Sequence, residues 1–524
     1  MASEWRIVGP PGTGKTSLLA RQVEQWAEHV PPERIVLTSY TRAAAAVLAG
    51  RIAVPRENIA TLHALAYRGI GKPPLAETGK LAALWNSQNH PVTWQIGGQS
   101  VDLEEGIMAE QDRGLMLADY NLYRATLRED SVAWERCRYF AEEWEAFKAE
   151  TGSIDFQDMI DFGYERTDSC PGEPEVLILD EAQDLNPSQW RLIRKWGASP
   201  TLSRFVVAGD PAQSIFGFVG AAPDAFMTEL PAQNQMVLSQ SWRMPVAIHT
   251  YAERWLSQHS PPMMEGRVFR PRDVEGDVGH TDACWRFPDA LMPLIEEDMA
   301  AGRTVLILAT CSYMLTPTIS MLRQNGVPFH NPYRRSNGAW NPLRGAREGQ
   351  VSTVDRLLAY LKNEQSAAET LRWFEMLEAK AFTGTKKNAM TGGVLPKNRP
   401  VLPADLIDLF IDEANDLPFG DIPALLRWAG TRYERPLTYA AAVINRRGRR
   451  RLQEEPLVAV GSIHSVKGGE ADCVYLYPDM SVAGAEEMTQ NIDATIRQFY
   501  VGMTRARERL VICAPDRIDR AVTL

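Results

Sequence analysis

The sequence lacks long hydrophobic runs and is poor in cysteine. No apolar stretch approaches the roughly 18 residues that a membrane-spanning helix requires. A glycine-rich pattern that begins at Gly9 leaves no room for a signal peptide ahead of it. The six cysteines lie far apart and form no C-x-x-C pair, which argues against a zinc or iron–sulfur centre and for reduced thiols. We therefore expect a protein without a membrane segment, in the cytoplasm of a bacterial cell or of the host of a phage.

An excess of positive charge is absent too. The chain has 56 Lys and Arg against 66 Asp and Glu, a formal net charge of −10. This balance usually counts against a nucleic-acid-binding protein, although a groove needs positive charge only along its own walls. Basic residues do cluster at residues 334–335 and 446–451. A nucleic-acid contact and a solvated loop are both open interpretations of these clusters.

The first positive signal is a glycine-rich loop between a strand and a helix. Residues 6–8 are typical of the end of a buried strand, and residues 17–27 have helical periodicity. The loop between them matches G-x-x-x-x-G-K-[ST], a pattern whose backbone N–H groups surround a polyphosphate at a helix N-terminus. Lys15 is expected to reach the β- and γ-phosphates, and the Thr16 hydroxyl to bind Mg²⁺. The residues expected to hold the nucleotide are Gly9, Pro10, Pro11, Gly12, Thr13, Gly14, Lys15 and Thr16.

A second signal lies in the stretch "EVLILDEAQDLNPSQWRLI". Its apolar run predicts a buried parallel strand that ends at Asp180 and Glu181, the edge where open α/β sheets place active sites. Asp180 can hold Mg²⁺ through water, and Glu181 can accept a proton from an attacking water. This pair indicates hydrolysis rather than transfer of the phosphoryl group to a small acceptor. A further strand, "FVVAGD", is followed by Gln213, which is then placed to sense the γ-phosphate.

More motifs follow in a fixed order: "LSQSWRMP" at residues 238–245, "VGSIHSVKGGEADCVYLY" at 460–477 and "QFYVGMTRARERLVI" at 498–512. Together with the earlier motifs they resemble the UvrD/Rep/PcrA-type helicases of superfamily 1A, over nearly the whole chain. "LTSYTRAAAAVLAGRI" is similar to the Ia segment of that family and "IATLHALAYR" to its Thr-Phe-His segment. "SIDFQDMIDFGYE" is similar to the stretch that precedes the Asp-Glu strand.

The resemblance implies roles for residues outside the loop. Trp242 would stack on the adenine and Glu470 would lie near the ribose. Arg243 and Arg505 would act as arginine fingers, which stabilise charge at the γ-phosphate only when two lobes close and so couple hydrolysis to movement. Lys467 would lie near the nucleotide. The residues expected to contact DNA, through this resemblance and through an aromatic turn after Gln213, are Thr38, Arg42, Thr61, His63, Phe216, Phe218 and His464.

The chain departs from the family pattern at three places. Only eight residues precede the loop, so the glutamine motif found there in relatives is absent and adenine selection is either relaxed or supplied elsewhere. Residues 216–219 read Phe-Gly-Phe-Val where the family commonly has Tyr-x-Trp-Arg, which keeps aromatic stacking but loses an arginine contact. Gly469 replaces a usual leucine.

The fold class that follows is α/β, with two RecA-like P-loop lobes built on parallel sheets, each carrying a mainly helical insertion. No internal repeat or low-complexity tract is evident, and 524 residues are too many for one ordinary core. We expect the first lobe at residues 1–66 and 151–234, with its insertion at 67–150. We expect the second lobe at residues 235–335 and 456–524, with its insertion at 336–455.

The function predicted from the sequence is an ATP- and Mg²⁺-dependent motor that moves 3′→5′ along single-stranded DNA and unwinds duplex ahead of it. The direction comes from the resemblance. Two alternatives stay open: a translocase that displaces proteins with little unwinding, and an assembly module that uses ATP as a conformational switch. Expected partners are single-stranded DNA and duplex junctions, without a membrane, and replication, repair or recombination proteins. A monomer is favoured.

Overall fold

The structure is a computed structural model, in which the chain divides into two compact units. One unit comprises residues 1–280, 310–312 and 462–524, and the other comprises residues 281–309 and 313–461. The structure describes residues 3–40, 45, 49–50, 52, 54–88, 90–96, 114–127, 132–259, 267–334, 337–344, 351–391, 395–396 and 398–524.

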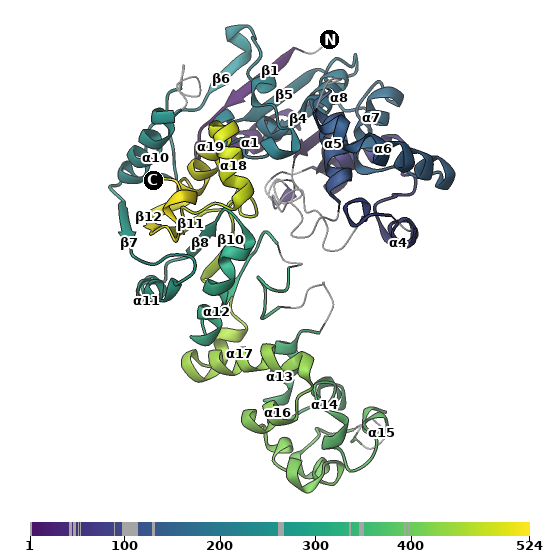
Figure 1. The fold of residues 1–524 in the computed structure, drawn as a ribbon, viewed down its shortest axis with the longest axis vertical. Coiled ribbons are helices and arrows are strands. Elements are labelled where there is room, and N and C mark those ends of the chain that lie inside the picture. The colour runs from purple at the N-terminus through teal and green to yellow at the C-terminus, as the bar shows by residue number, and fades with distance from the viewer. Residues whose placement is uncertain are drawn as a thin grey trace. The chain divides into compact units, whose positions relative to one another are not determined.

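A six-stranded sheet forms the centre of the first unit (Figure 1). Its strand order is β3-β2-β4-β5-β1-β6, and each pair of neighbours runs parallel. The register aligns Ser39 with Asp180 and Val8 with Gly209, so the carboxyl ends of these four strands meet at one edge. The strands are β1 (Glu4–Val8), β2 (Ile35–Ser39), β3 (Ile59–Thr61), β4 (Val176–Asp180), β5 (Arg204–Gly209) and β6 (Gln235–Val237).

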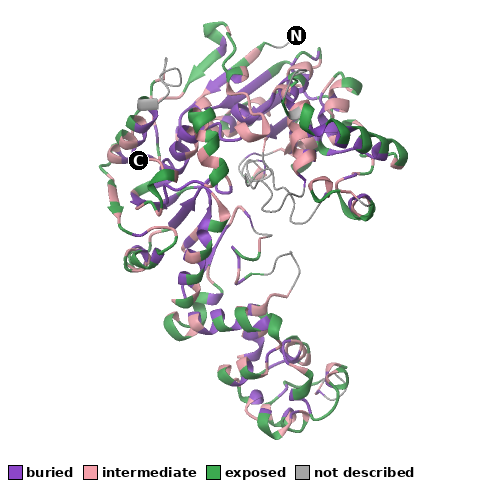
Figure 2. Ribbon diagram, viewed as in Figure 1, coloured by how far each residue is buried: buried purple, intermediate pink, exposed green. Residues whose placement is uncertain are grey.

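Helices cover both faces of this sheet because its strands are apolar on both sides. In β4, Leu177 and Leu179 belong to one buried cluster, whereas Val176 and Ile178 belong to another. The first cluster is completed by residues of α3, α7 and α8, the second by residues of α1. Figure 2 shows the resulting buried centre. These helices are α1 (Lys15–Trp26), α3 (Leu62–Gly69), α7 (Phe156–Arg166) and α8 (Pro187–Gly197), with the short α9 (Pro223–Phe226) nearby in sequence.

Three of the helices between β3 and β4 along the chain pack around an aromatic core. Trp85 and Trp144 meet edge to face with ring centroids 4.9 Å apart, and Phe140 and Phe147 stack on either side of Trp144. The helices are α4 (Gly79–Ser87), α5 (Leu115–Thr126) and α6 (Val132–Thr151).

A second six-stranded sheet has the order β7-β12-β11-β8-β10-β9. The pairs β11–β12 and β9–β10 are parallel, and the five residues of β8 are all buried. Two α/β lobes with parallel sheets are thereby confirmed. The strands are β7 (Asp277–Thr281), β8 (Val305–Ala309), β9 (Phe329–His330), β10 (Val458–Ser462), β11 (Ala471–Leu476) and β12 (Ala506–Cys513).

The remaining helices divide between the two units. The first unit also contains α10 (Val246–His259), α18 (Val482–Gln490) and α19 (Ile492–Met503). The second unit contains α11 (Leu291–Ala300), α12 (Thr316–Gln324), α13 (Thr353–Tyr360), α14 (Ala367–Phe374), α15 (Lys386–Met390), α16 (Ile422–Trp428) and α17 (Thr431–Arg447). Among the described residues, no helix is both long enough and apolar enough to span a bilayer.

Candidate nucleotide site and nucleic-acid interface

The glycine-rich loop joins strand β1 to helix α1, in the order that the sequence predicts. Gly12 and Gly14 have φ values of 71° and 83°, in the left-handed region that glycine adopts without strain. Gly14 caps α1, whose first turn carries no acidic side chain, so the positive end of the helix dipole is not neutralised. Lys15 Nζ donates to the Gly9 carbonyl at 2.6 Å. The Lys15 ammonium thus lies against the loop at the N-terminus of α1.

The hydroxyl of Thr16 and the carboxylate of Asp180 form a pair of oxygens suited to a hard cation. Thr16 Oγ1 lies 3.5 Å from Asp180 Oδ2. Burial, reinforced by the neighbouring Glu181 carboxylate, raises the pKa of Asp180 to about 7. A divalent cation would offset this unfavourable burial of charge. Oxygen donors are the ligands that Mg²⁺ prefers, so the residues present fit that ion.

Glu181 follows β4 in a strained backbone conformation. Its φ of 55° and ψ of 40° are left-handed, which costs a non-glycine residue about 1–3 kcal/mol and is found mostly at functional sites. Burial alone would raise the pKa of this carboxyl, but the cations of Lys467 and Lys15 and a hydrogen bond from Gln183 outweigh burial and lower the pKa. Glu181 is therefore ionised and able to accept a proton.

Gln213 connects three distant motifs of the chain. Its Nε2 donates to Asp210 Oδ2 at 2.8 Å, and its Oε1 accepts from Arg505 Nη2 at 3.0 Å across 292 positions. The backbone carbonyl of Gln213 accepts from Lys467 Nζ at 2.7 Å, and the same ammonium forms an ion pair with Asp184. Gln213, Arg505 and Lys467 thus belong to one hydrogen-bonded group.

Trp242 and Arg243 lie against the phosphate loop. The Trp242 backbone N–H donates to the Gly12 carbonyl at 2.8 Å, and its side chain is 72% exposed, so an indole face is free beside the loop. Arg243 Nε forms an ion pair with Glu470 at 2.6 Å. Arg243, which is expected to act as an arginine finger, thus holds Glu470, which is expected near the ribose.

The two phenylalanines of the aromatic turn after Gln213 differ in how far they are buried. Phe216 is fully buried between Tyr40 and Phe218, with ring centroids 5.0 and 6.0 Å away. Phe218 is half-buried on the short helix η6 (Gly217–Val219), and its ring meets His464 edge to face at 5.4 Å. A fully buried ring offers no face to a base, so Phe216 supports the turn from inside, contrary to a direct stacking role.

The other expected DNA contacts differ in accessibility. Thr38 is fully buried at the end of β2 and does not reach solvent, in contrast to its expected place at a DNA surface. Thr61 caps α3 by accepting from the Ala64 N–H at 3.3 Å and stays half-buried, as does His63. Burial lowers the pKa of His63 to about 4, so its imidazole is neutral at physiological pH. Arg42 lies outside the described residues.

The arginine run at residues 446–451 makes contacts inside the second unit. Arg447 forms an ion pair with Glu296, and Arg449 donates to the carbonyls of Leu358 and Leu361 near the end of α13. These bonds favour an internal anchoring role for part of the run. In the other basic cluster, Arg334 is buried and residue 335 lies outside the described residues.

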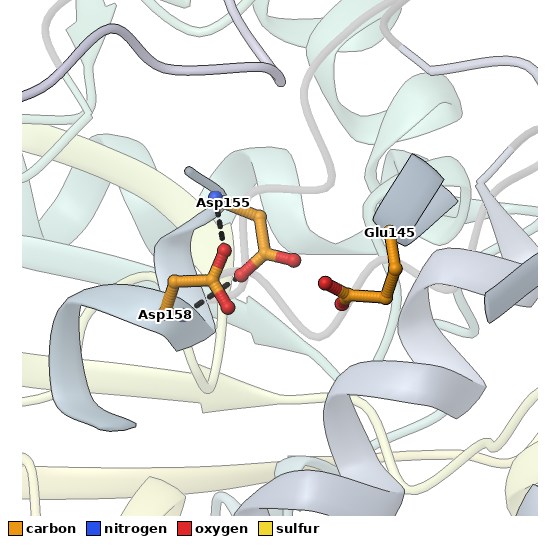
Figure 3. A group of neighbouring side chains, drawn as sticks. All are labelled: Glu145, Asp155 and Asp158. Carbon is orange, nitrogen blue, oxygen red and sulfur yellow. Dashed lines mark hydrogen bonds between the residues drawn. The ribbon is translucent and has the colours of Figure 1, made fainter. Parts of the chain in front are cut away.

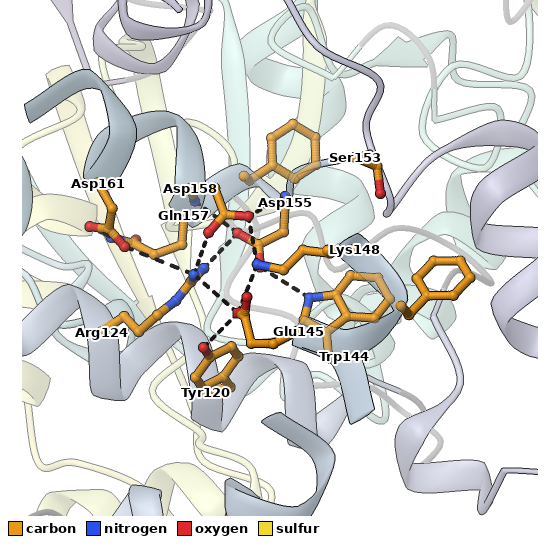
Figure 4. Close-up of polar contacts among 12 residues, drawn as sticks. Tyr120, Arg124, Trp144, Glu145, Lys148, Ser153, Asp155, Gln157, Asp158 and Asp161 are labelled. Atoms are coloured by element: carbon orange, nitrogen blue, oxygen red, sulfur yellow. Dashed lines mark hydrogen bonds and ion pairs between the residues drawn. The ribbon is translucent and has the colours of Figure 1, made fainter. Parts of the chain in front are cut away.

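Three carboxylates elsewhere in the first unit have the spacing of a metal site (Figure 3). Ligand oxygens of Glu145, Asp155 and Asp158 all lie within 4.8 Å of one another. The Lys148 ammonium already occupies their centre, at 2.8, 2.9 and 2.5 Å respectively. Arg124 adds bonds of 2.5 and 2.6 Å to the two aspartates (Figure 4). The cluster is an ion-pair network that joins α5 and α6 to α7, and we assign no metal to it.

The sequence pattern at the end of β4 predicts roles for Asp180 and Glu181 but none for Gln183 and Asp184, which follow them. Gln183 contacts Glu181, and Asp184 pairs with Lys467, so both belong to the site. The signal that could have found them is their position on the short turn directly after β4. Ser241, whose Oγ donates to the Pro11 carbonyl at 3.0 Å, gave no such signal.

These features define a P-loop protein with two α/β lobes, in which motifs from distant parts of the chain meet at the carboxyl edge of the first sheet. Residues 1–232 match the model of the UvrD/REP helicase N-terminal domain, and residues 457–513 match the UvrD-like helicase C-terminal domain. The two matches cover more than half of the chain, which belongs to the UvrD/Rep-type helicase family.

Three relatives share parts of the sequence. YjcD of Bacillus subtilis, provisionally assigned as an ATP-dependent DNA helicase, is 28% identical over 271 residues, or 45% of this chain and 34% of YjcD. The ATP-dependent DNA helicase Rep of Escherichia coli is 28% identical over 189 residues, 32% of this chain and 28% of Rep. The F-box DNA helicase protein 1 of Schizosaccharomyces pombe is 32% identical over 104 residues, 20% of this chain and 11% of that protein. The matches thus span about a third of YjcD and less of the other two relatives.

Proposed function

We propose that this chain is an ATP-dependent motor that moves 3′→5′ along single-stranded DNA and unwinds duplex ahead of it. The observation that carries the proposal is the hydrogen-bonded group in which Gln213 joins Arg505 and Lys467 beside the ionised Glu181. Family membership and the names of the relatives support the choice of DNA as the substrate.

The residues at the sheet edge divide the hydrolytic work among themselves. Lys15 and the loop N–H groups hold the phosphates, and Trp242 offers its exposed face to the base. Thr16 and Asp180 would hold Mg²⁺, which when bound neutralises charge on the phosphates. Glu181 accepts a proton from the attacking water at its carboxylate. Arg505 and Arg243 supply cations to the charge that develops at the γ-phosphate.

Coupling to DNA rests on the short distance along the chain between Gln213 and Phe218. Lys467 holds the Gln213 carbonyl, and His464, three residues earlier, pairs its Nε2 with the Ile215 carbonyl at 3.0 Å. A movement of this segment that accompanies nucleotide binding would therefore shift the aromatic turn as well. Phe218 is our proposed stacking platform, because base–aromatic stacking tolerates any sequence.

Steady-state ATPase with and without single-stranded oligonucleotides tests the proposal. We expect strong DNA stimulation of the wild-type protein. Lys15→Ala should weaken nucleotide binding and hydrolysis, whereas Glu181→Gln should lose hydrolysis and keep nucleotide binding. ATPase that ignores DNA would favour the conformational switch. DNA stimulation without strand separation would favour the protein-displacing translocase.

A further inference from the structure

A glutamine side chain bridges two strand ends at the centre of the candidate ATPase site. Gln183 lies on the short helix η4 (Ala182–Asp184) after β4 and is 0% exposed. Its Nε2 donates to Glu181 Oε2 at 2.6 Å, and its Oε1 accepts from the Asp210 backbone N–H at 3.0 Å. One amide group thus contacts the ends of both β4 and β5.

The orientation of this amide follows from its partners. A backbone N–H can only donate, so the amide oxygen must face Asp210 and the NH₂ group must face the Glu181 carboxylate. The absence of a side chain at Gly209 leaves room for this amide. A Cβ on Gly209 would lie 2.4 Å from Gln183 Oε1, a distance that no side chain could tolerate without displacing the amide. Position 209 is therefore matched to the glutamine at 183.

The bridge continues to the expected γ-phosphate sensor. Asp210 Oδ2 accepts from Gln213 Nε2 at 2.8 Å, and Gln213 Oε1 accepts from Arg505 Nη2 at 3.0 Å. A connected path therefore runs from Glu181 through Gln183 and Asp210 to Gln213 and Arg505. Each step is a short bond between buried or half-buried groups, where hydrogen bonds hold geometry most firmly.

We propose that Gln183 is a positioning residue for ATP hydrolysis, which holds the Glu181 carboxylate in register with Gln213 and Arg505. The role rests on the proposed ATPase function. A glutamate side chain has three rotatable bonds, so without the amide its carboxylate would sample several orientations. In most of these orientations the carboxylate would not reach a water beside the γ-phosphate. A small displacement of a reacting group lowers the rate of catalysis strongly.

Gln189 provides a matched control for this role. It is 2% exposed and belongs to the same unit, and its Oε1 accepts from the Asn186 N–H at 3.0 Å in the capping box of α8. Its replacement removes a buried glutamine bond of equal length without touching the candidate site. Any effect that Gln183 variants share with Gln189→Met is therefore a cost of folding alone.

The test compares Gln183→Met, Gln183→Glu and Gln189→Met for DNA-stimulated kcat, KM for ATP and Tm. The methionine removes both bonds at similar volume, and the glutamate keeps the shape but loses the donor. We expect both Gln183 variants to lower kcat by about 10- to 100-fold with KM little changed, as is usual for residues that orient a reacting group. Gln189→Met should lower Tm and keep kcat.

A double variant distinguishes positioning from an independent effect. If Gln183 acts through Glu181, then Glu181→Gln combined with Gln183→Met should be no slower than Glu181→Gln alone. Fully multiplicative losses would overturn the role, and so would Gln183 variants that lose Tm but keep kcat. A wild-type protein without ATPase would overturn the proposed function itself, which is a separate and earlier result of the same assay.

Discussion

At position 181 the chain places a glutamate in a backbone conformation that most residues avoid. The apolar strand followed by Asp-Glu is sufficient to predict the strand end where two carboxylates emerge. It is insufficient to predict how the Glu181 carboxylate, our proposed general base, is oriented. The Gln183 amide that holds Glu181 is itself held by the Asp210 N–H, directly after β5, a strand that neighbours β4 only in the folded sheet.

The aromatic turn shows the same limit. The sequence places Phe216 and Phe218 two residues apart on an exposed-looking turn and cannot tell which ring faces inward. That choice depends on Tyr40 and His464, which pack against the turn from distant positions. Only Phe218 keeps accessible surface for a ligand.

Arg505 is expected to act as an arginine finger. Replacing it with Ala should reduce DNA-stimulated kcat on the order of 10³-fold or more, because a cation that stabilises the γ-phosphate is lost. Nucleotide binding, measured with a fluorescent analogue, should fall much less. Arg505 is buried, so a melting curve must accompany the assay.

Arg243→Ala, which removes the more exposed ion pair with Glu470, should likewise lower kcat much more than nucleotide binding. A change in binding alone would refute the finger role.

Phe218→Ala tests the stacking platform. The variant should keep ATPase in the absence of DNA but lose much of the DNA stimulation and nearly all unwinding, since each stacked base is worth about 1–3 kcal/mol. Steady-state ATPase against oligonucleotide concentration measures this. Phe216→Leu serves as the comparison, because it changes the buried ring and should chiefly lower Tm. Intact DNA stimulation in Phe218→Ala would return Phe218 to a packing role.

At the scale of elements, helical periodicity predicts α6 but not what fixes it in place. The helix carries Lys148 on its buried side, and this ammonium neutralises carboxylates from α6 itself and from the start of α7. Sequence periodicity cannot reveal such a network. Lysine is rarely buried without a partner, so the helical pattern alone would place Lys148 on an exposed face.

Lys148→Met should destabilise the protein strongly. The substitution leaves Asp155 and Asp158 buried with only Arg124 to compensate them, and breaking a buried pair from one side costs about 3–5 kcal/mol. Urea unfolding measures the change. Arg136→Met on the same helix is the control, since its side chain is 56% exposed and its single ion pair, with the half-buried Asp119, should be worth only about 1 kcal/mol. Equal losses in the two variants would contradict the network.

Glu77 should make stability depend on pH. Burial and the nearby Asp155 carboxylate raise the pKa of Glu77 to about 8 from its usual 4.5, against the opposing cations Arg124 and Lys148. The folded protein then holds a proton that the unfolded chain releases. This contribution is fully present below the unfolded pKa and is lost as pH rises towards the folded pKa.

Glu77→Gln removes that proton and keeps an acceptor for the Phe156 N–H, which now bonds Glu77 at 3.0 Å. The wild-type protein should therefore lose stability relative to the variant between about pH 5 and pH 8. Urea unfolding at several pH values measures the difference. A constant gap between the two proteins across that range would show that Glu77 is ionised in the folded state.

For the whole molecule, the order of motifs along the chain is enough to predict two α/β lobes and the family. The structure adds how the motifs meet: Arg505 bonds Gln213, and Lys467 pairs with Asp184. These contacts join residues almost 300 positions apart, and no local pattern specifies them. They bring cations from the C-terminal part of the chain, Lys467 and Arg505, close to the carboxylate of Glu181, our proposed general base.

Unwinding of duplexes with a single-stranded tail on either the 3′ or the 5′ end, with and without ATP, tests the motor most directly. We expect the protein to open the 3′-tailed duplex only when ATP is present, and to leave the 5′-tailed duplex closed. Glu181→Gln should open neither. Opening of the 5′-tailed duplex in preference to the 3′-tailed one, or no opening of either despite DNA-stimulated ATPase, would contradict a 3′→5′ helicase.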